Sequence, residues 1–144
     1  MKTDAAAQQA KACAERMYST DLASQSLGMK VTVDEPGRAI ASMTITESML
    51  NGQRLCHGGF IFALADSAFA FACNGYDDIT VAGAATIDFL RPAQLGDVLT
   101  ATAVERQRGR RNGVYDVTVQ NQHGKDVALF RGKSVATGQP MLTD

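Results

Sequence analysis

The sequence predicts an α+β domain in which an antiparallel sheet of about six strands wraps around one long central helix. Three observations lead to this fold class. Residues 57–74 are almost entirely apolar and long enough for a helix. Segments on both sides of them alternate between apolar and polar residues, as strands do. The connections between the last segments are short, and short connections join antiparallel strands. A sheet with one face exposed to water needs cover on its other face, which the apolar helix can supply.

The first elements follow from local signals. Residues 1–27 are rich in Ala, Gln, Lys and Glu, which favours one or two surface helices ending near Gly28. Two strands then flank a tight turn at Pro36-Gly37. The second of them alternates with period two, placing Ala39, Ala41, Met43 and Ile45 on one face.

The second half of the chain is one helix and four strands. The helix of residues 57–74 is followed by Gly75, a residue type that commonly follows a helix end. Strands are predicted at residues 79–90, 98–108, 113–122 and 126–136, separated by Gly-, Pro- and Asn-containing turns. All 144 residues are expected to form one domain, with 1–27 as its N-terminal helical segment.

Composition limits the function classes. The net charge is −1, which argues against nucleic acid as a partner. The three cysteines include no C-x-x-C pair, which favours a reducing compartment. The N-terminal residues lack the continuous apolar run of a signal peptide, and the longest apolar run is broken by Asp66 and Ser67, so a cytoplasmic protein without a membrane span is expected.

Asp66 is the unusual residue of the apolar helix. A buried carboxylate without partners is costly, so Asp66 must be neutral, paired or facing a wet cavity. One interpretation is a paired structural acid, or one exposed at an interface. The other is a carboxylate base or nucleophile that lines a pocket.

The start of the same helix predicts a second functional feature. His57, Gly58 and Gly59 precede the bulky residues. The first N–H groups of a helix lack intrahelical partners, the helix dipole favours negative charge there, and glycine lets a ligand approach closely. Such a site can stabilise an oxyanion. A tight turn with close packing is the alternative.

The spacing between the two features predicts a homodimer. Gly58 and Asp66 are eight residues apart, which is ~12 Å along a helix axis. An oxyanion donor and an attacking group must both lie about 3 Å from one carbonyl. Two antiparallel copies of the helix, related by a two-fold axis, would bring the start of one helix to the middle of the other.

Three stretches carry a resemblance to a known family. They read "LNGQRLCHGGFIFALADSAFAFACNG", "TIDFLRPAQLGDVLTATA" and "ALFRGKS". Together they resemble the hotdog-fold acyl-CoA thioesterases, in particular the phenylacetic-acid-degradation (PaaI) type, over roughly residues 18–134. The resemblance implies a hotdog domain, homodimers that commonly pair into tetramers, and no cofactor, since CoA is part of the substrate.

The resemblance also implies roles for four residues. Asp66 matches the catalytic carboxylate, which acts as nucleophile or as base for water. Gly58 matches the residue whose N–H polarises the thioester carbonyl, and Asn51 matches the amide that places the water or the carbonyl. His57 fits a supporting role in orienting the loop. Some relatives carry a hydroxyl residue at positions that here hold Ala70 and Ala84, and Ser67 or Thr86 are the candidate substitutes.

The substrate implied is phenylacetyl-CoA or hydroxylated phenylacetyl-CoA, with a medium-chain acyl-CoA as the alternative. Arginine is well suited to the phosphates of CoA, although most surface arginines are merely solvated. The candidate substrate- and CoA-binding residues are Gly59, Arg91, Arg110, Arg111, Asn112 and Lys133. Candidate walls of the acyl pocket are Leu50, Leu55, Phe60, Phe69 and Phe89, most of which could equally be core.

Other functions fit the sequence less well. His57 and His123 are the only histidines and lie outside any metal-ligand spacing, so no metal is expected. Cys56 beside His57 is a weak candidate thiol nucleophile, because adjacent residues rarely aim at each other. A dehydratase acting on hydroxyacyl thioesters and a non-catalytic acyl-CoA sensor are the remaining alternatives.

Overall fold

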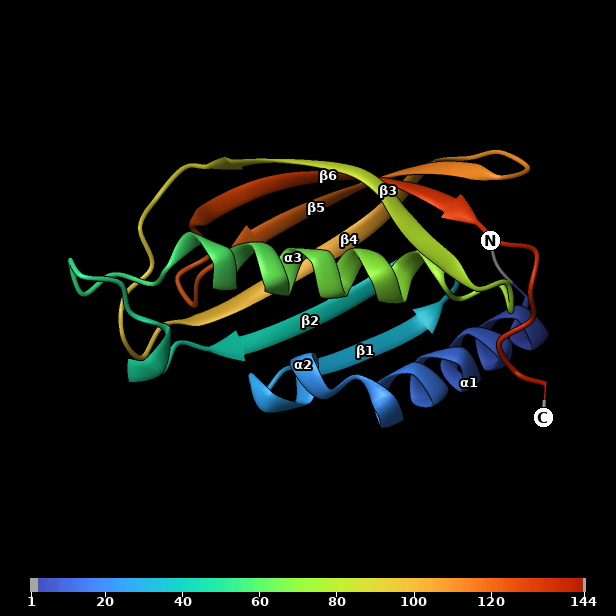
Figure 1. The fold of residues 1–144 in the computed structure, drawn as a ribbon, viewed down its shortest axis with the longest axis horizontal. Coiled ribbons are helices and arrows are strands. Elements are labelled where there is room, and N and C mark those ends of the chain that lie inside the picture. Colours follow the sequence, from blue (N-terminus) through green and yellow to red (C-terminus); the bar gives the residue numbers. More distant parts are fainter. Residues whose placement is uncertain (1–2, 144) are drawn as a thin grey trace.

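The computed structural model describes residues 3–143, and within them it has the predicted α+β architecture. Six strands form one sheet in the order β1-β2-β4-β5-β6-β3, and every pairing is antiparallel. The sheet curves behind helix α3, which lies across its concave side (Figure 1). The elements are α1 (Asp4–Thr20), α2 (Leu22–Ser26), β1 (Lys30–Glu35), β2 (Arg38–Thr44), a 3-10 turn (Glu47–Met49), α3 (Gly58–Cys73), β3 (Thr80–Phe89), β4 (Val98–Arg108), β5 (Asn112–Gln120) and β6 (Asp126–Ala136).

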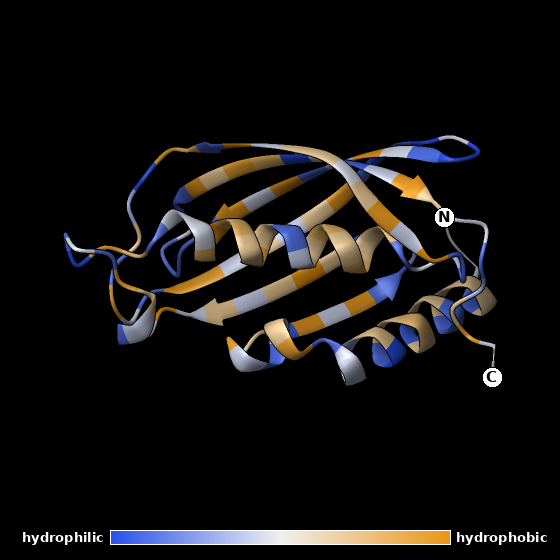
Figure 2. Ribbon diagram, viewed as in Figure 1, coloured by the Kyte–Doolittle hydropathy of each residue, from blue (hydrophilic) through white to orange (hydrophobic). Residues whose placement is uncertain are grey.

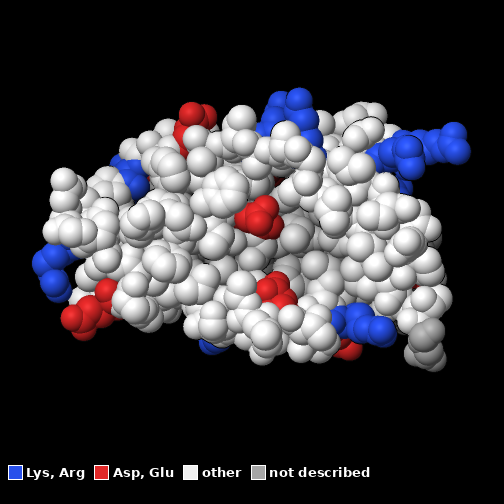
Figure 3. Space-filling model, in the orientation of Figure 1, with Lys and Arg blue, Asp and Glu red and all other residues white. Residues whose placement is uncertain are grey.

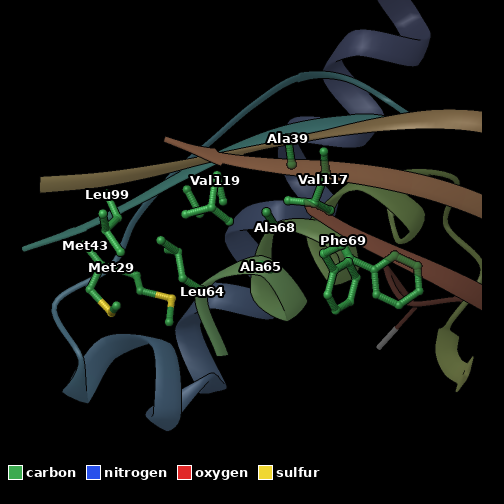
Figure 4. Close-up of a cluster of buried hydrophobic side chains, with 14 of the residues drawn as sticks. Met29, Ala39, Met43, Leu64, Ala65, Ala68, Phe69, Leu99, Val117 and Val119 are labelled. Carbon is green, nitrogen blue, oxygen red and sulfur yellow. The ribbon is translucent and has the colours of Figure 1, made fainter. Parts of the chain in front are cut away.

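The core lies between one side of α3 and the inner face of the sheet. Leu64, Ala65, Ala68 and Phe69 point from the helix toward residues of β2, β4 and β5 (Figure 4). The ring of Phe69 lies so close to Gly132 that a Cβ there would be 2.7 Å from it. The predicted alternation is confirmed, since the inward side chains of β2 and β5 are buried: Ala39, Ala41, Met43, Tyr115, Val117 and Val119.

The two edges of the sheet differ. At one edge, α1 packs against β1 (Figure 1). At the other edge, nearly every residue of β3 is exposed, including Val81 (51%) and Phe89 (53%). A ten-residue edge strand with exposed apolar side chains presents unpaired backbone groups to another chain.

Helix α3 ends where the sequence predicts, with Asn74 as its C-cap and Gly75 directly after it, but the cap is built differently. Gly75 does not take the left-handed conformation that favours glycine after a helix. Instead, Asn74 closes the helix, since its Nδ2 donates to the Ala70 carbonyl (2.9 Å) and its Oδ1 accepts from the Thr80 N–H (2.8 Å). Glycine is needed at position 75 for another reason, because a Cβ there would lie 2.9 Å from the Pro36 Cα.

Helix α3 is not buried on all sides within one chain. One face stays partly open: Gly59 is exposed, and Phe62, Ala63, Asp66 and Ala70 are half-buried. Their spacing of three, four, seven and eleven residues puts them on one side of the helix. Figure 2 shows α3 as apolar along its length with a hydrophilic position at its middle. We call this side the open face of α3.

The surface in front of α3 is poor in charge. In Figure 3, lysine and arginine lie at the rim of this view, whereas an acidic group lies at the centre over α3. Within residues 3–143, no helix has both the length and the apolar character required to cross a lipid bilayer.

Candidate active site

The first turn of α3 has an amide without a partner. His57 is the N-cap, and its Nδ1 accepts a hydrogen bond from the Gly59 N–H (3.0 Å), while its carbonyl accepts from the Phe60 N–H (3.0 Å). The Gly58 N–H makes no hydrogen bond to any residue from 3 to 143. The cap therefore engages the amide of Gly59, a predicted substrate-binding residue, and leaves that of Gly58 available.

The side chain of Asn51 is fixed by hydrogen bonds to its oxygen atom, Oδ1. Its Oδ1 accepts hydrogen bonds from the Gln53 N–H (2.9 Å) and the Leu55 N–H (3.1 Å). The loop is tightly wound, since Arg54 has a φ of 61° and its N–H donates to the Asn51 carbonyl (2.9 Å). Only an oxygen can accept both side-chain bonds, so the Nδ2 amide is the end left for other partners. In the described chain Nδ2 has none, and Asn51 can act there only as a donor.

Asn51 and Gly58 line the same cavity. It has a volume of about 320 Å³ and lies between the start of α3 and the segment that follows β3. The tip of the Phe89 ring reaches Gly58 so closely that a Cβ there would be 3.2 Å from the ring's Cζ. The side chains of Leu55, Ile61, Leu90 and Arg91 complete much of the wall. Two residues with unengaged donors thus line a hollow of mixed polar and apolar walls that is large enough for part of a small ligand.

Asp66 lies on the open face of α3, away from that cavity. Within residues 3–143 its carboxylate makes no hydrogen bond or ion pair, and burial raises its pKa above the ordinary value. Gly58 begins the helix and Asp66 is eight residues on, ~12 Å along the axis. A single chain therefore cannot bring this carboxylate and the Gly58 amide to one carbonyl group.

Ser67, the candidate substitute for the missing hydroxyl, is engaged elsewhere. Its Oγ lies 2.9 Å from the Oγ of Ser24 on α2, which donates in turn to the Asp21 carboxylate (2.6 Å). Because the Ser24 proton goes to Asp21, the proton between the two serines comes from Ser67. Ser67 thus ties α2 to α3 and can only accept from a further partner. Thr86, the other candidate, is exposed on β3.

The other candidate CoA-binding residues lie in three places. Arg91 lines the cavity at Gly58. Arg110 and Arg111 lie in the turn between β4 and β5 and Asn112 begins β5, at the opposite end of α3 in the same chain (Figure 1). Lys133 is exposed on β6, on the sheet face turned away from α3. The structure of one chain brings none of these groups together.

The placement of Arg111 follows from hydrogen bonds. Its carbonyl accepts from the Ala136 N–H (2.7 Å). Ala136 pairs with Thr80, and the Thr80 N–H donates to the Asn74 side chain at the end of α3. These contacts place Arg111 near that end of the helix.

The candidate acyl-pocket residues and the candidate thiol nucleophile lie in different environments. Leu55 and Phe89 line the cavity, whereas Phe69 is buried in the core. Burial, and then the charge of Asp97, raise the pKa of the Cys56 thiol to about 11. That thiol is protonated at neutral pH, which disfavours it as a nucleophile. Sequence reasoning missed Lys125, which lines a hollow beyond Arg91, because a lysine in a polar turn carries no signal of its own.

Comparison with known proteins places the chain in a family. Residues 53–128 match the Thioesterase superfamily. The chain is 51% identical to the acyl-coenzyme A thioesterase PaaI of Escherichia coli K12, over 87% of this chain and 89% of the relative. The solved structure of the E. coli PaaI protein, from the phenylacetic acid degradation operon, superposes with a TM-score of 0.91 at 48% identity, covering 93% of this chain and 97% of that one.

A more distant structure was solved with a ligand. It is a Streptococcus mutans protein bound to acetyl CoA, which is 28% identical with a TM-score of 0.74 and covers 78% of this chain and 90% of its own. The sequence identity of 51% to the E. coli relative extends over 87% of this chain, and the two structures share the fold. These two findings establish the family. The chain belongs to the Thioesterase superfamily and is a PaaI-type acyl-CoA thioesterase with the hotdog fold.

Proposed function

We propose that the protein hydrolyses phenylacetyl-CoA or a hydroxylated phenylacetyl-CoA in two equivalent sites between two copies of the chain. One chain supplies the Gly58 N–H and the Asn51 amide, and the other supplies Asp66. The observation that carries this proposal is the separation within α3: two unengaged donors stand at its start, and an unengaged carboxylate stands ~12 Å along it.

In this mechanism the thioester carbonyl oxygen accepts hydrogen bonds from the Gly58 N–H and the Asn51 Nδ2. Both donors are fixed before the substrate arrives, so they stabilise the charge that develops on that oxygen. The Asp66 carboxylate of the facing chain then attacks the carbonyl carbon, CoA leaves as the thiolate, and water hydrolyses the mixed anhydride. In the alternative route, Asp66 takes a proton from a water that attacks directly.

The proposed dimer accounts for two exposed surfaces. The open face of α3 is apolar apart from Asp66, and β3 is an uncovered edge strand at the sheet's end. Pairing two β3 edges about a two-fold axis would extend the sheet and set the two α3 helices antiparallel. Further pairing of such dimers into a tetramer, as the family resemblance implies, is part of the same proposal.

The acyl group is assigned from similarity and from surroundings. The E. coli relative comes from a phenylacetic acid degradation operon. Phe62 and Ala63 flank Asp66 on the open face, where an aromatic acyl group would meet apolar side chains. A panel of phenylacetyl-, hydroxyphenylacetyl- and medium-chain acyl-CoA thioesters, read by release of free thiol, tests this. A higher kcat/KM for medium-chain than for aryl-acetyl substrates would contradict the assignment.

The shared site has a test of its own. Asp66→Ala and Asn51→Asp chains should each be inactive, but randomly mixed dimers should regain about a quarter of wild-type activity, because half of the dimers are mixed and one of their two sites is intact. The two variants are mixed after mild dissociation and assayed at fixed total protein. Absence of recovery, with mixed dimers demonstrated by tagged chains, would rule out a site built from two chains.

A further inference from the structure

The middle of α3 is tied to the N-terminal part of the chain next to Asp66. Ser67, the residue that follows Asp66, has its Oγ 2.9 Å from the Oγ of Ser24 on α2. No other side chain among residues 60–72 forms a hydrogen bond within residues 3–143. The contact between the two serines is therefore the only side-chain hydrogen bond that links this stretch of α3 to the rest of the described chain.

The contact ends on a carboxylate, which sets the direction of its protons. The Ser24 hydroxyl donates to the Asp21 Oδ2 (2.6 Å), and the Ser24 N–H donates to the Asp21 Oδ1 (2.9 Å). Since the Ser24 proton is used on Asp21, Ser24 accepts from Ser67. A hydrogen bond from a hydroxyl to a carboxylate is stronger than one between two neutral groups. Ser24 is 1% exposed, so bulk water does not compete for its hydroxyl.

Helix α2 is itself held by the surrounding chain. It has five residues, too few to be stable alone. The Ser24 carbonyl accepts the Met29 N–H (3.0 Å), and the Met29 carbonyl accepts the hydroxyl of Tyr18 on α1 (2.7 Å). The Met29 side chain is buried in the same core as Leu64 of α3 (Figure 4). Helix α2 is thus a fixed support for the middle of α3.

We propose that Ser24 is a positioning residue for the Asp66 carboxylate and acts on it through Ser67. The inference rests on the proposed catalytic role of Asp66. Because Ser67 is the next residue of the same helix, a rotation of α3 that breaks the contact between the serines also moves the carboxylate. Burial of Ala65 and Ala68 stabilises this turn without direction. A hydrogen bond, by contrast, is directional and fixes the rotation of the helix.

Loss of the contact should lower kcat and leave KM unchanged. Reacting atoms must lie about 3–3.5 Å apart, and a misplacement of ~1 Å costs about a hundredfold in rate. Ser24→Ala is therefore expected to lower kcat at least about tenfold. KM should stay at the wild-type value, because the proposed donors to the carbonyl, Gly58 and Asn51, lie outside the contact. An unchanged kcat, or a loss that appears in KM alone, would overturn the proposal.

A matched control exists on the same helix. Ser26 is exposed, and its hydroxyl donates only to the Ala23 carbonyl (3.0 Å). Ser26→Ala should therefore keep the wild-type kcat and KM. A fall in kcat as large as that of Ser24→Ala would contradict the proposal, because it would show that any change in α2 has this effect.

A cycle of variants tests whether the two serines act as a unit. Ser67→Ala should lower kcat by the same factor as Ser24→Ala, and the double variant should lower it no further, because either change breaks the same contact. Ser67→Thr keeps a hydroxyl and should restore kcat. If Ser24→Ala does not fold, Ser67→Ala serves in its place, since it leaves Ser24 bonded to Asp21. Losses that multiply in the double variant would show that the serines act separately.

The Asp66→Ala background separates positioning from general damage to the site. Its residual turnover depends on substrate binding and on the carbonyl donors. Adding Ser24→Ala should leave that residual turnover unchanged, because no carboxylate remains to be positioned. A further fall in kcat of the size seen in the wild-type background would refute the inference. Near-normal activity of Asp66→Ala itself would instead refute the proposed function, so the two failures are distinguishable.

Discussion

The imidazole of His57 accepts the N–H of Gly59 across 3.0 Å, and in doing so it decides which amide of the first turn of α3 remains for a ligand. A helix start offers several unpaired N–H groups. Here the residue before the helix removes one of them and leaves the neighbouring Gly58 N–H beside the cavity. The cap thus serves the stability of the helix and the selection of the donor at once.

Replacing His57 tests both consequences. His57→Ala removes the acceptor for the Gly59 N–H and is expected to lower the free energy of unfolding by about 1 kcal/mol, with a loss in kcat as the first turn loosens. His57→Asn offers another capping oxygen and should recover the stability. Urea unfolding and steady-state kinetics measure the two effects. Equal stability of His57→Ala and the wild type would show that the cap contributes nothing.

Asn51 can be tested by a nearly isosteric change. Asn51→Asp keeps an oxygen for the Gln53 and Leu55 N–H groups, so the loop should keep its conformation. It replaces the Nδ2 donor with negative charge, and removal of one oxyanion donor costs roughly a hundredfold to a thousandfold in kcat. The melting temperature should stay near that of the wild type. Activity within a few-fold of the wild type would exclude Asn51 as a donor to the carbonyl.

Asp66 should show opposite effects on activity and stability. The kcat of Asp66→Ala is expected to fall roughly a hundredfold to ten-thousandfold. Burial raises the pKa of Asp66 above 3.8, so the folded state holds this proton more tightly than the unfolded state does. The free energy of unfolding therefore falls as pH rises from 3.8 through the folded-state pKa. Asp66→Ala removes that loss and should be at least as stable as the wild type at neutral pH.

The same pKa shift sets the pH profile. Because the ionised carboxylate is the reactive form, kcat/KM of the wild type should rise with pH through a limb centred above 3.8. Asp66→Glu keeps a carboxylate and serves as the control, since a limb should persist but move. A flat profile across this range in the wild type would contradict a catalytic role for Asp66.

Gly132 tests the packing of α3 on the sheet. Gly132→Ala would place a Cβ 2.7 Å from the Phe69 ring, and overpacking of this kind costs about 1–3 kcal/mol. Gly109→Ala is the matched control, because a Cβ there meets only the Asn112 carbonyl oxygen, at 3.4 Å. Adding Phe69→Leu to Gly132→Ala should recover part of the loss. Thermal unfolding that ranks the two single variants equally would contradict the close packing.

The fold was largely predictable because its elements have simple periodic signals. The alternation of β2 and β5 determines which side chains are buried, and Val98–Arg108 and Asp126–Ala136 begin and end where their turn residues indicate. The length of α3 followed from its apolar run. The position of the end of α3 was predicted, but the capping role of the Asn74 side chain was not, since its hydrogen bonds depend on the later position of Thr80.

The site was only partly predictable. Gly58 and Asp66 stand out because a glycine pair and an acid are unusual in an apolar helix. The sequence does not reveal which atom of Asn51 is free, because that depends on how the loop winds back on its own carbonyl oxygen. The sequence also does not reveal which residues of α3 form its open face, because an apolar residue looks the same whether its own chain or another one covers it.

The loop at Asn51 also carries a chemical liability. Asn51 is followed by Gly52, and the backbone nitrogen after an asparagine attacks the side-chain amide most readily when the next residue is glycine. Loss of ammonia would leave a cyclic succinimide, which water opens to aspartate or isoaspartate. The aspartate product still satisfies the loop but no longer donates. An ageing preparation would then accumulate a more acidic charge variant that melts like fresh enzyme and turns over almost nothing. Shelf life of this protein should accordingly be judged by charge heterogeneity and specific activity, since thermal unfolding would not register the loss.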